Sequence, residues 1–455
     1  MDITLSLSAI CEAICADQKL FGDISFVTTD SRQACPGSLF VALRGERFDG
    51  HQFIGQALEK GARCVVADTP GDYPMERTLL VGNTERALRR IAALYRSRLR
   101  TKIVAVTGSV GKTSTRDMAA AVLSSAYRTA KTQGNLNNQV GVPQTVLAID
   151  RTHQAAVVEM GMSGFGEIEE ISLCASPDVA IITNIGVSHM ERLGSREGIF
   201  RAKTEIVRGL RPGAPLILNG DDDLLCTYRN PDCDILLFGI DNPRCAVRAS
   251  DIQDGLQETL FVIHYAGECY PARIPALGRH NVLNALAGFA AGVALGIAPE
   301  QAARALGEFE ATGMRQRMVT CGGFTVVEDC YNASPDSFRA ALHTLAQRPC
   351  AGRRILIAAD MLELGDIAAE AHRAVGALAG ELGIDAVYTF GELGREIAAG
   401  AAAGGVPDVR QFTNKPDLAA DLAAAAKPGD LLWFKASRGM KLEDVIETVY
   451  EERGK

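Results

Sequence analysis

Residues 103–115 read IVAVTGSVGKTST, a run of β-prone residues followed by a glycine loop that ends in Lys-Thr. A strand over 103–107 would carry Gly108 and Gly111 into a tight turn. Backbone N–H groups of such a turn, together with the amino end of the next helix, bind phosphate. Lys112 would then reach the β- and γ-phosphates of a nucleotide, and Thr113 would bind Mg²⁺.

This loop departs from the usual G-x-x-x-x-G-K-[ST] pattern, because Val106 stands where the first glycine belongs. A plain turn between a strand and a helix would explain the two glycines, but it would not explain the Lys-Thr pair that follows them. We therefore predict nucleotide binding by Gly108, Ser109, Val110, Gly111, Lys112, Thr113 and Ser114.

Polar residues also follow two other candidate strands. Glu159 closes the apolar run AAVVE, and His189 follows VAIITNIGVSH. The carboxyl ends of parallel strands meet at one edge of a sheet, so both side chains are predicted to approach the phosphates and their metal. Lys203, within IFRAKTEIV, reads by itself as a solvated surface lysine.

The segment RHNVLNAL places Asn281 and Asn284 three residues apart on one face of a helix start. Their amides can cap the helix or hydrogen-bond the edge of an adenine. The spacing does not decide between these two roles.

Composition excludes several classes of protein. The net charge is −8 and no dense Lys/Arg run occurs, which disfavours nucleic-acid binding. The twelve cysteines lack C-x-x-C spacing and are typical of reduced thiols in a cytoplasm. The N-terminus has no basic start followed by an apolar run, and the longest weakly apolar run, 285–298, is too short to span a bilayer. We expect a cytoplasmic protein without membrane insertion.

The fold class is predicted to be α/β, with three domains in 455 residues. Short strand candidates (39–43, 64–67 and 78–81) and a charged helix (84–99) suggest an N-terminal α/β module over 1–99. From 100 to 312, apolar strand candidates at 103–106, 155–159, 179–183 and 216–219 predict a central, doubly wound, mostly parallel sheet with the phosphate loop after its first strand. The pattern restarts over 313–455, where strands at 324–327, 354–358, 386–390 and 431–435 predict a Rossmann-like α/β domain.

These elements, in this order, resemble the Mur ligase family of ATP-dependent amide-forming enzymes of peptidoglycan precursor synthesis. The resemblance runs through almost the whole chain. It rests on the phosphate loop, on GNLNNQVGVP (134–143), on EMGMSGFGEI (159–168), and on DCYNASPDSFRAAL and AADMLELGD in the last third. A further segment, 30–62, resembles the uridine-nucleotide module of two branches of the family.

The resemblance implies which residues bind the substrates. A UDP-linked substrate would contact Ser31, Arg32, Phe48, Asp49, Gly50 and His51 in the first domain. The acceptor loop and its neighbours would contribute Asn135, Asn137, Asn138, Ser163 and Asn332. Adenine would lie against Asn281 and Asn284, Arg315 or Arg317 would approach the γ-phosphate, and Asp329 and Tyr331 would close over the nucleotide.

The resemblance also gives Lys203 a role. It implies a lysine that reacts with CO₂ to form N6-carboxylysine, a carbamate able to bind a second Mg²⁺. The metal ligands would then be Thr113, Glu159, His189 and Lys203, with Lys112, Glu159, His189 and Lys203 as the catalytic set. A site that lowers the proton affinity of Lys203 would favour this chemistry.

The activity implied is an ADP-forming ligase that joins D-alanyl-D-alanine to UDP-N-acetylmuramoyl-tripeptide, acting as a monomer in the cytoplasm. Two alternatives stay open at this point. One is another ligase of the superfamily, similar to MurE or to folylpolyglutamate synthase. The other is a phosphate-loop ATP switch that ligates nothing.

Overall fold

The computed structural model describes residues 4–45 and 48–454; positions 1–3 and 455, the ends of the first and last predicted domains, lie outside them. Each sheet takes all of its strands from one continuous stretch of the chain, although in the two largest sheets the order of the strands differs from their order in the sequence. We call residues 4–99, 100–312 and 313–454 the N-terminal, central and C-terminal regions. All three combine sheets with helices, which confirms the α/β class.

The N-terminal region is built on a parallel sheet of short apolar strands. Its order is β3 (Phe26–Thr28), β4 (Ser38–Val41), β5 (Cys64–Ala67) and β6 (Thr78–Leu80), beside a small antiparallel pair of β1 (Leu5–Ser6) and β2 (Asp23–Ile24). The helices are α1 (Leu7–Ile14), α2 (Ile54–Glu59) and α3 (Thr84–Arg96). The three predicted strands are confirmed, with ends shifted by at most two residues.

The central region contains a nine-stranded sheet, ordered β15-β14-β13-β12-β11-β10-β7-β9-β8. The strands from β8 to the start of β13 run parallel, while β14 pairs antiparallel with both β13 and β15. Their bounds are β7 (Lys102–Thr107), β8 (Thr129–Lys131), β9 (Ala155–Glu159), β10 (Val179–Ile182), β11 (Pro215–Asn219), β12 (Asp234–Gly239), β13 (Val247–Asp254), β14 (Thr259–Tyr265) and β15 (Glu268–Ile274). The predicted parallel sheet is confirmed, and the antiparallel meander is an addition to it.

Helices cover both faces of this sheet, which explains why its inner strands are apolar throughout. One face packs on α4 (Lys112–Ser124), α9 (Arg279–Ala294) and α10 (Pro299–Ala305). The other packs on α5 (Gly141–Ala148), α6 (Glu167–Ala175) and α8 (Arg196–Thr204), with the short α7 (Met190–Leu193) nearby. The apolar run 285–298 therefore lies mostly within a buried helix, as predicted.

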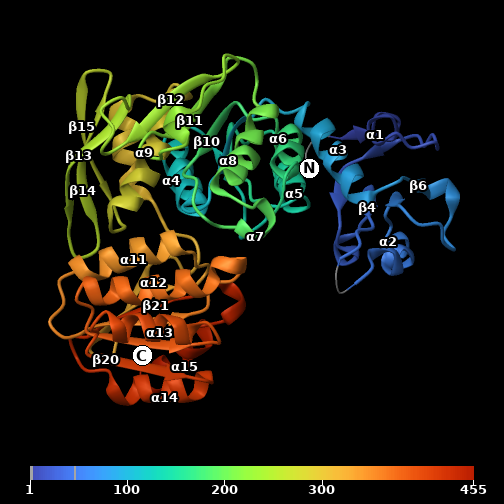
Figure 1. Ribbon diagram of the computed structural model, residues 1–455. Helices are drawn as coiled ribbons and strands as arrows, with labels where there is room; N and C mark the ends of the chain where they lie inside the picture. Colours follow the sequence, from blue (N-terminus) through green and yellow to red (C-terminus); the bar gives the residue numbers. More distant parts are fainter. Residues whose placement is uncertain (1–3, 46–47, 455) are drawn as a thin grey trace.

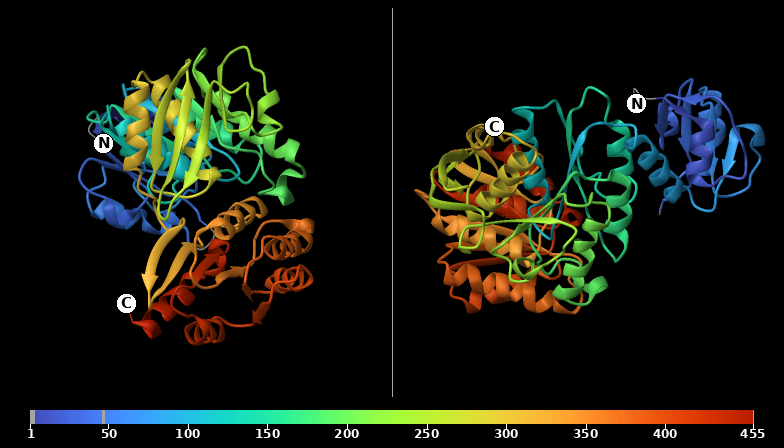
Figure 2. Two further views of the ribbon diagram at one scale, coloured as in Figure 1. Left: turned by 90° about the vertical axis from the view of Figure 1, so that its left-hand side faces the viewer. Right: turned by 90° about the horizontal axis from the view of Figure 1, so that it is seen from above.

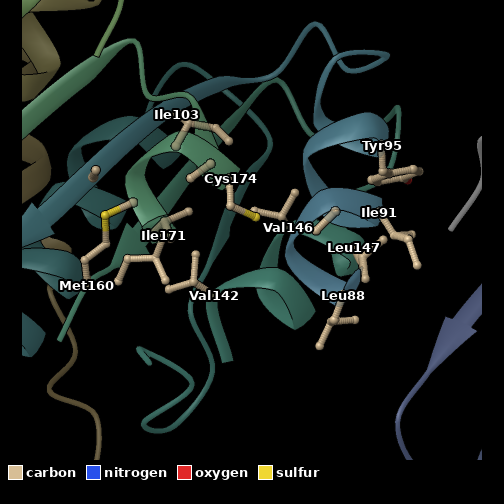
Figure 3. Close-up of a cluster of buried hydrophobic side chains, with 14 of the residues drawn as sticks. Leu88, Ile91, Tyr95, Ile103, Val142, Val146, Leu147, Met160, Ile171 and Cys174 are labelled. Carbon is tan, nitrogen blue, oxygen red and sulfur yellow. The ribbon is translucent and has the colours of Figure 1, made fainter. Parts of the chain in front are cut away.

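Helix α3 ties the N-terminal region to the central region. Its apolar stripe, which includes Leu88 and Ile91, belongs to the same buried cluster as residues of α5 and α6, as Figure 3 shows. The hydroxyl of Tyr95 donates to the carbonyl of Ile149 over 2.6 Å. The charged helix predicted from the sequence is thus a structural joint: its apolar side and Arg96 are buried, while Arg86 and Arg90 are exposed.

The C-terminal region has a six-stranded sheet ordered β16-β17-β21-β18-β19-β20, parallel except for the β16–β17 hairpin. The strands are β16 (Arg317–Cys321), β17 (Phe324–Asp329), β18 (Arg354–Ala359), β19 (Ala386–Phe390), β20 (Asp408–Phe412) and β21 (Leu431–Lys435). Helices α11 (Pro335–Gln347), α12 (Ala368–Glu381) and α13 (Gly394–Ala403) cover one face, and α14 (Lys415–Ala425) and α15 (Glu443–Arg453) cover the other. The four predicted strands are confirmed.

The N-terminal and C-terminal regions lie on different sides of the central region (Figure 1). Seen from above, the N-terminal region stands apart while the other two regions overlap (Figure 2). No helix among the described residues is both long and apolar enough to cross a membrane.

Candidate active site

A cleft of about 670 Å³ lies between the central and C-terminal regions. Loops after β7, β9 and β10 line it on one side, and the ends of β17 and β21 with the start of α11 line the other. The carboxyl ends of two parallel sheets therefore face each other across it, where ligands of such sheets usually bind.

The phosphate loop bends sharply into this cleft. Gly111 has a φ of 84°, and a Cβ built on it would lie 2.5 Å from Asn284 Oδ1, so both backbone conformation and space require glycine. Lys112 Nζ donates to the carbonyls of Gly108 (2.8 Å) and Ser109 (3.4 Å). Burial lowers the pKa of Lys112, Glu159 opposes that shift, and Arg315 adds to it. The lysine thus lies in a desolvated cleft, where its charge acts strongly on phosphate.

Asn184, which the sequence analysis did not single out, anchors the same loop. Its Oδ1 accepts hydrogen bonds from the backbone N–H groups of Ser109 (3.1 Å) and Val110 (2.9 Å). Thr183 Oγ1 adds a bond to the carbonyl of Val110 (2.6 Å). The only sequence signal was the position of this Thr-Asn pair directly after a buried strand.

Glu159, at the end of β9, accepts hydrogen bonds from side chains of α4 and of the asparagine-rich loop. Its Oε2 accepts from Thr113 Oγ1 (2.9 Å), and its Oε1 accepts from Asn137 Nδ2 (2.9 Å). Glu159 is buried, yet both it and Thr113 line the cleft. A hydroxyl oxygen beside a carboxylate suits Mg²⁺, which prefers oxygen ligands.

No cluster of three or more His, Cys, Asp or Glu that could hold a metal occurs among the described residues. This does not conflict with Mg²⁺, which is usually held by one or two carboxylates together with substrate phosphates and water. The residues present therefore fit a nucleotide-bound magnesium ion, with Thr113 and Glu159 as its protein oxygens.

Lys203 lies in α8 and is 1% exposed, so its interpretation as a surface lysine is wrong. Burial lowers its pKa well below the ordinary value, and the charge of Lys112 lowers it further. No ion-pair partner is found for Lys203 among the described residues. It is not one of the residues that line the cleft.

His189 faces the opposite region. It has a left-handed backbone conformation, with φ of 65°, and its Nδ1 lies 2.9 Å from Glu363 Oε2 in the loop after β18. The hydrogen bond from His189 lowers the pKa of Glu363. This pair joins the two sides of the cleft, and Glu363 was not identified from the sequence.

The two asparagines of α9 belong to a hydrogen-bond network beside the phosphate loop. Asn284 Oδ1 accepts from Thr115 Oγ1 (3.1 Å), and Asn284 Nδ2 donates to Asn281 Oδ1 (3.3 Å). Asn281 Nδ2 donates to the carbonyl of Leu277 (2.9 Å) and to Gln316 Oε1 (3.1 Å). Both asparagines are buried and line the cleft, so they do more than cap a helix.

The structure separates the two arginines of GMRQRM. Arg315 lines the cleft, and its guanidinium lies 4.4 Å from the centre of the Tyr331 ring. Arg317 is absent from the cleft lining, is 66% exposed in its side chain and lies 3.6 Å from Glu328. Only Arg315 is therefore placed to meet a phosphate.

Several other predicted residues reach the cleft. Asp329 accepts from Lys435 Nζ (2.8 Å) and Trp433 Nε1 (3.3 Å), two cleft residues that the sequence analysis did not identify. The remaining predicted residues that line it are Ser114, Asn135, Asn138, Ser163 and Asn332.

The residues predicted to bind UDP lie outside this cleft, in the N-terminal region. Arg32 is 82% exposed in its side chain and pairs with Asp30 (2.8 Å). Ser31 Oγ donates to Gln56 Oε1 (2.6 Å). The loop that follows, which comprises Phe48, Asp49, Gly50 and His51, holds an exposed Phe48 and a hydrogen bond between Asp49 Oδ1 and His51 Nδ1 (2.6 Å). The structure does not bring this group to the phosphate loop.

Comparisons with known proteins agree on one family. Residues 23–96 match the catalytic domain model of the Mur ligase family, 106–292 match the Mur ligase middle domain, and 314–438 match the Mur ligase glutamate ligase domain. The chain is 44% identical over 429 residues to the UDP-N-acetylmuramoyl-tripeptide--D-alanyl-D-alanine ligase of Bacillus subtilis, with 93% of each chain covered.

Solved structures agree with the sequence comparison. The crystal structure of MurF from Acinetobacter baumannii has a TM-score of 0.89 and 32% identity over 99% of both chains. The MurF ligase of Thermotoga maritima in complex with ADP has a TM-score of 0.85 and 28% identity, over 94% of this chain and 97% of that one.

Proposed function

The chain belongs to the Mur ligase family, and we propose that it joins D-alanyl-D-alanine to UDP-N-acetylmuramoyl-tripeptide while ATP is converted to ADP and phosphate. The observation that carries this proposal is the single cleft in which the phosphate loop, the asparagine-rich acceptor loop and the C-terminal motif meet. A phosphate-loop switch would have no use for the last two elements.

The chemistry begins at a carboxylate, which resists attack by an amine because oxide is a very poor leaving group. A terminal carboxylate oxygen of the tripeptide attacks the γ-phosphorus of ATP, the bond to ADP breaks, and an acyl phosphate forms. The dipeptide amine then attacks the acyl carbon and loses a proton. Phosphate leaves with the electrons of the broken C–O bond, and the amide remains.

Lys112 and Arg315 supply the fixed positive charge for the first step. Both line the cleft, and the charge of Arg315 lowers the pKa of Lys112, which indicates that the two side chains are close in space. Phosphoryl transfer depends mainly on such positioning and charge stabilisation. Thr113 and Glu159 would hold Mg²⁺, which reduces the repulsion between the triphosphate and the acceptor carboxylate when bound.

We also propose that Lys203, which does not line the cleft but is near enough to Lys112 for that charge to lower its pKa, acts in this site as N6-carboxylysine. A neutral Lys203 amine adds to the carbon of CO₂, an N–C bond forms, and one proton is released to leave a carbamate anion. Burial supports this assignment, since a lowered pKa supplies the neutral amine. With Glu159 and His189, the carbamate would hold a second Mg²⁺.

The three regions divide the substrates in this proposal. The domain 1–99 binds the UDP group, 100–312 binds ATP, and 313–455 closes on ATP and binds the dipeptide. The enzyme would act as a monomer in the cytoplasm, and the free state of its cysteines in the structure is compatible with that compartment.

The direct test is product analysis. Purified protein with Mg²⁺, ATP, D-alanyl-D-alanine and UDP-tripeptide should yield UDP-pentapeptide by mass spectrometry, with one ADP and one phosphate per product. Tripeptides ending in diaminopimelate or in lysine would be compared. Diaminopimelate, lysine and glutamate would replace the dipeptide as nucleophiles, and a product from one of these alone would favour a MurE-like or folate-type ligase. ATP binding without any product would leave only a nucleotide switch.

A further inference from the structure

A buried ionic network lies directly behind Glu159. Arg116 Nη1 donates to Glu159 Oε2 (3.3 Å), while its Nε and Nη2 both donate to Asp117 Oδ1 (2.9 and 2.8 Å). Arg116 is fully buried and Asp117 is 3% exposed. Neither residue lines the cleft, and neither was identified from the sequence. Two adjacent residues of α4 thus form a buried ion pair behind the carboxylate that would bind metal.

Arg116 and a metal ion would use the same oxygen. Glu159 Oε2 already accepts from Thr113 and from Arg116, and Thr113 is the hydroxyl placed to share the metal. A guanidinium in a desolvated site attracts a carboxylate strongly, because the low effective dielectric leaves the interaction unscreened. An Arg116 without a second anion would therefore compete with Mg²⁺ for Glu159.

Asp117 supplies that second anion, and two further hydrogen bonds hold its carboxylate in place. Its Oδ1 also accepts from Lys131 Nζ on β8 (2.9 Å). Its Oδ2 accepts from the backbone N–H of Thr312 (3.2 Å), in the connection that leads to the C-terminal region. Asp117 therefore binds Arg116 through Nε and Nη2, while Nη1 of Arg116 donates both to Glu159 and to the carbonyl of Gly134 (3.1 Å).

We propose that Asp117 is a positioning residue for ligation, which neutralises Arg116 and so keeps Glu159 available to Mg²⁺. The inference rests on the proposed function and deepens it, because it names the group that sets the metal affinity of the site. Residues outside the direct ligands of a metal typically change its affinity or the activity by about 10- to 100-fold.

The test compares three variants. Asp117→Asn should raise the Mg²⁺ concentration for half-maximal ligation by about 10-fold or more, and should weaken Mg²⁺-dependent ADP binding in calorimetry to a similar degree. The double variant Arg116→Gln with Asp117→Asn removes both charges, and it should need less Mg²⁺ than Asp117→Asn does. Asp178→Asn is the matched control, because Asp178 pairs with the buried Arg96 (3.0 Å) and bonds the N–H of Ile103 at the opposite end of the sheet. It should leave the Mg²⁺ dependence unchanged.

An unchanged Mg²⁺ dependence in Asp117→Asn would overturn the inference, as would a double variant that is no better than the single one. If the single variant does not fold because an unpaired buried cation is costly, the neutral double variant decides. Its Mg²⁺ requirement should be close to that of the natural protein, and a 10-fold increase would contradict the proposal. Absence of pentapeptide product from the natural protein would be a separate failure, of the proposed function.

Discussion

In the proposed reaction, Lys112 is the residue on which the chemistry most depends, because it would place a fixed cation where phosphoryl charge develops. We expect Lys112→Ala to lower the ligation rate by about 10³-fold or more, a loss typical of a preorganised charge stabiliser. Lys102→Ala is the control, because that lysine lies at the start of β7 and bonds Tyr127 and Leu295. Steady-state ADP release with all substrates present measures both. Near-normal turnover by Lys112→Ala would remove its role.

A different result is expected for Lys203, because its proposed active form carries an added carboxylate. Lys203→Ala should abolish ligation, and short carboxylates such as formate or acetate should restore part of the rate by occupying the vacated position. Lys112→Ala should gain nothing from these anions. Rates measured across a carboxylate titration test the difference. An undiminished rate in Lys203→Ala would eliminate the carbamate.

Single residues show where sequence reasoning ends. The phosphate loop could be identified because its residues are contiguous, and Glu159 and His189 because each follows an apolar strand. The contacts of Arg116 with Glu159 and of Asn184 with the phosphate loop join residues more than 40 positions apart. Such pairs depend on which strands become neighbours, and no local pattern encodes that. The burial of Lys203 is hidden from the sequence for the same reason.

At the scale of elements, the residue before α4 must be glycine for two reasons, its backbone conformation and the packing around it. Gly111 and Gly166 begin helices with φ of 84° and 82°, but only Gly111 has a neighbour within reach of an added Cβ. Gly166→Ala should therefore lower the free energy of unfolding by about 1 kcal/mol from backbone strain. Gly111→Ala should lower the free energy of unfolding by more than this, because Asn284 must also move. The same substitution should weaken ATP binding. Urea unfolding and calorimetric ATP titration measure the two effects, and equal losses would contradict the packing argument.

The start of α9 should respond to acid through His280. Burial lowers its pKa from 6.5 to about 4, and its Nε2 lies 2.9 Å from Gln316 Nε2, which donates to the neutral ring. Between pH 6.5 and 4 the unfolded chain binds more protons at this histidine, so folding stability falls as pH decreases through that window. The loss reaches at most about 3 kcal/mol. The variant His280→Gln has no such titrating group. Its free energy of unfolding should therefore rise relative to that of the natural protein as the pH falls from 6.5 to 4. A difference that stays constant with pH would contradict this.

Elements also differ in how far the sequence could predict them. Strands such as β9 and β19 were predicted with their exact bounds because both faces of a parallel sheet are covered and the strands read as continuous apolar runs. The meander β13 to β15 alternates buried and exposed residues on one uncovered face, and was not predicted. β8 has only three residues, all partly exposed, and gives no pattern of its own.

At the scale of the whole molecule, the proposed closure of the cleft would depend on the connection after the central region. No helix or strand lies between Glu308 and Arg317, and Gln316 has a φ of 57°. Hydrogen bonds at Thr312 and Gln316 hold this connection to the central region. Beyond it, Glu363 of the C-terminal region lies 2.9 Å from His189 on the phosphate-loop side. Segments of this kind act as hinges.

Substrate binding should therefore make the molecule more compact. ATP bound between Lys112 and Arg315 would attract both sides of the cleft. The N-terminal region, which would bind the UDP group, stands apart from the other two regions (Figure 2) and would have to move toward the cleft. Small-angle X-ray scattering with a non-hydrolysable ATP analogue and UDP-tripeptide should show a smaller radius of gyration than the free protein. Lys112→Ala at the same ligand concentrations should stay extended, because the charge that joins nucleotide to protein is gone. An unchanged radius at ligand saturation, verified by calorimetry, would mean that the regions are already in their catalytic arrangement and that closure is not part of the reaction.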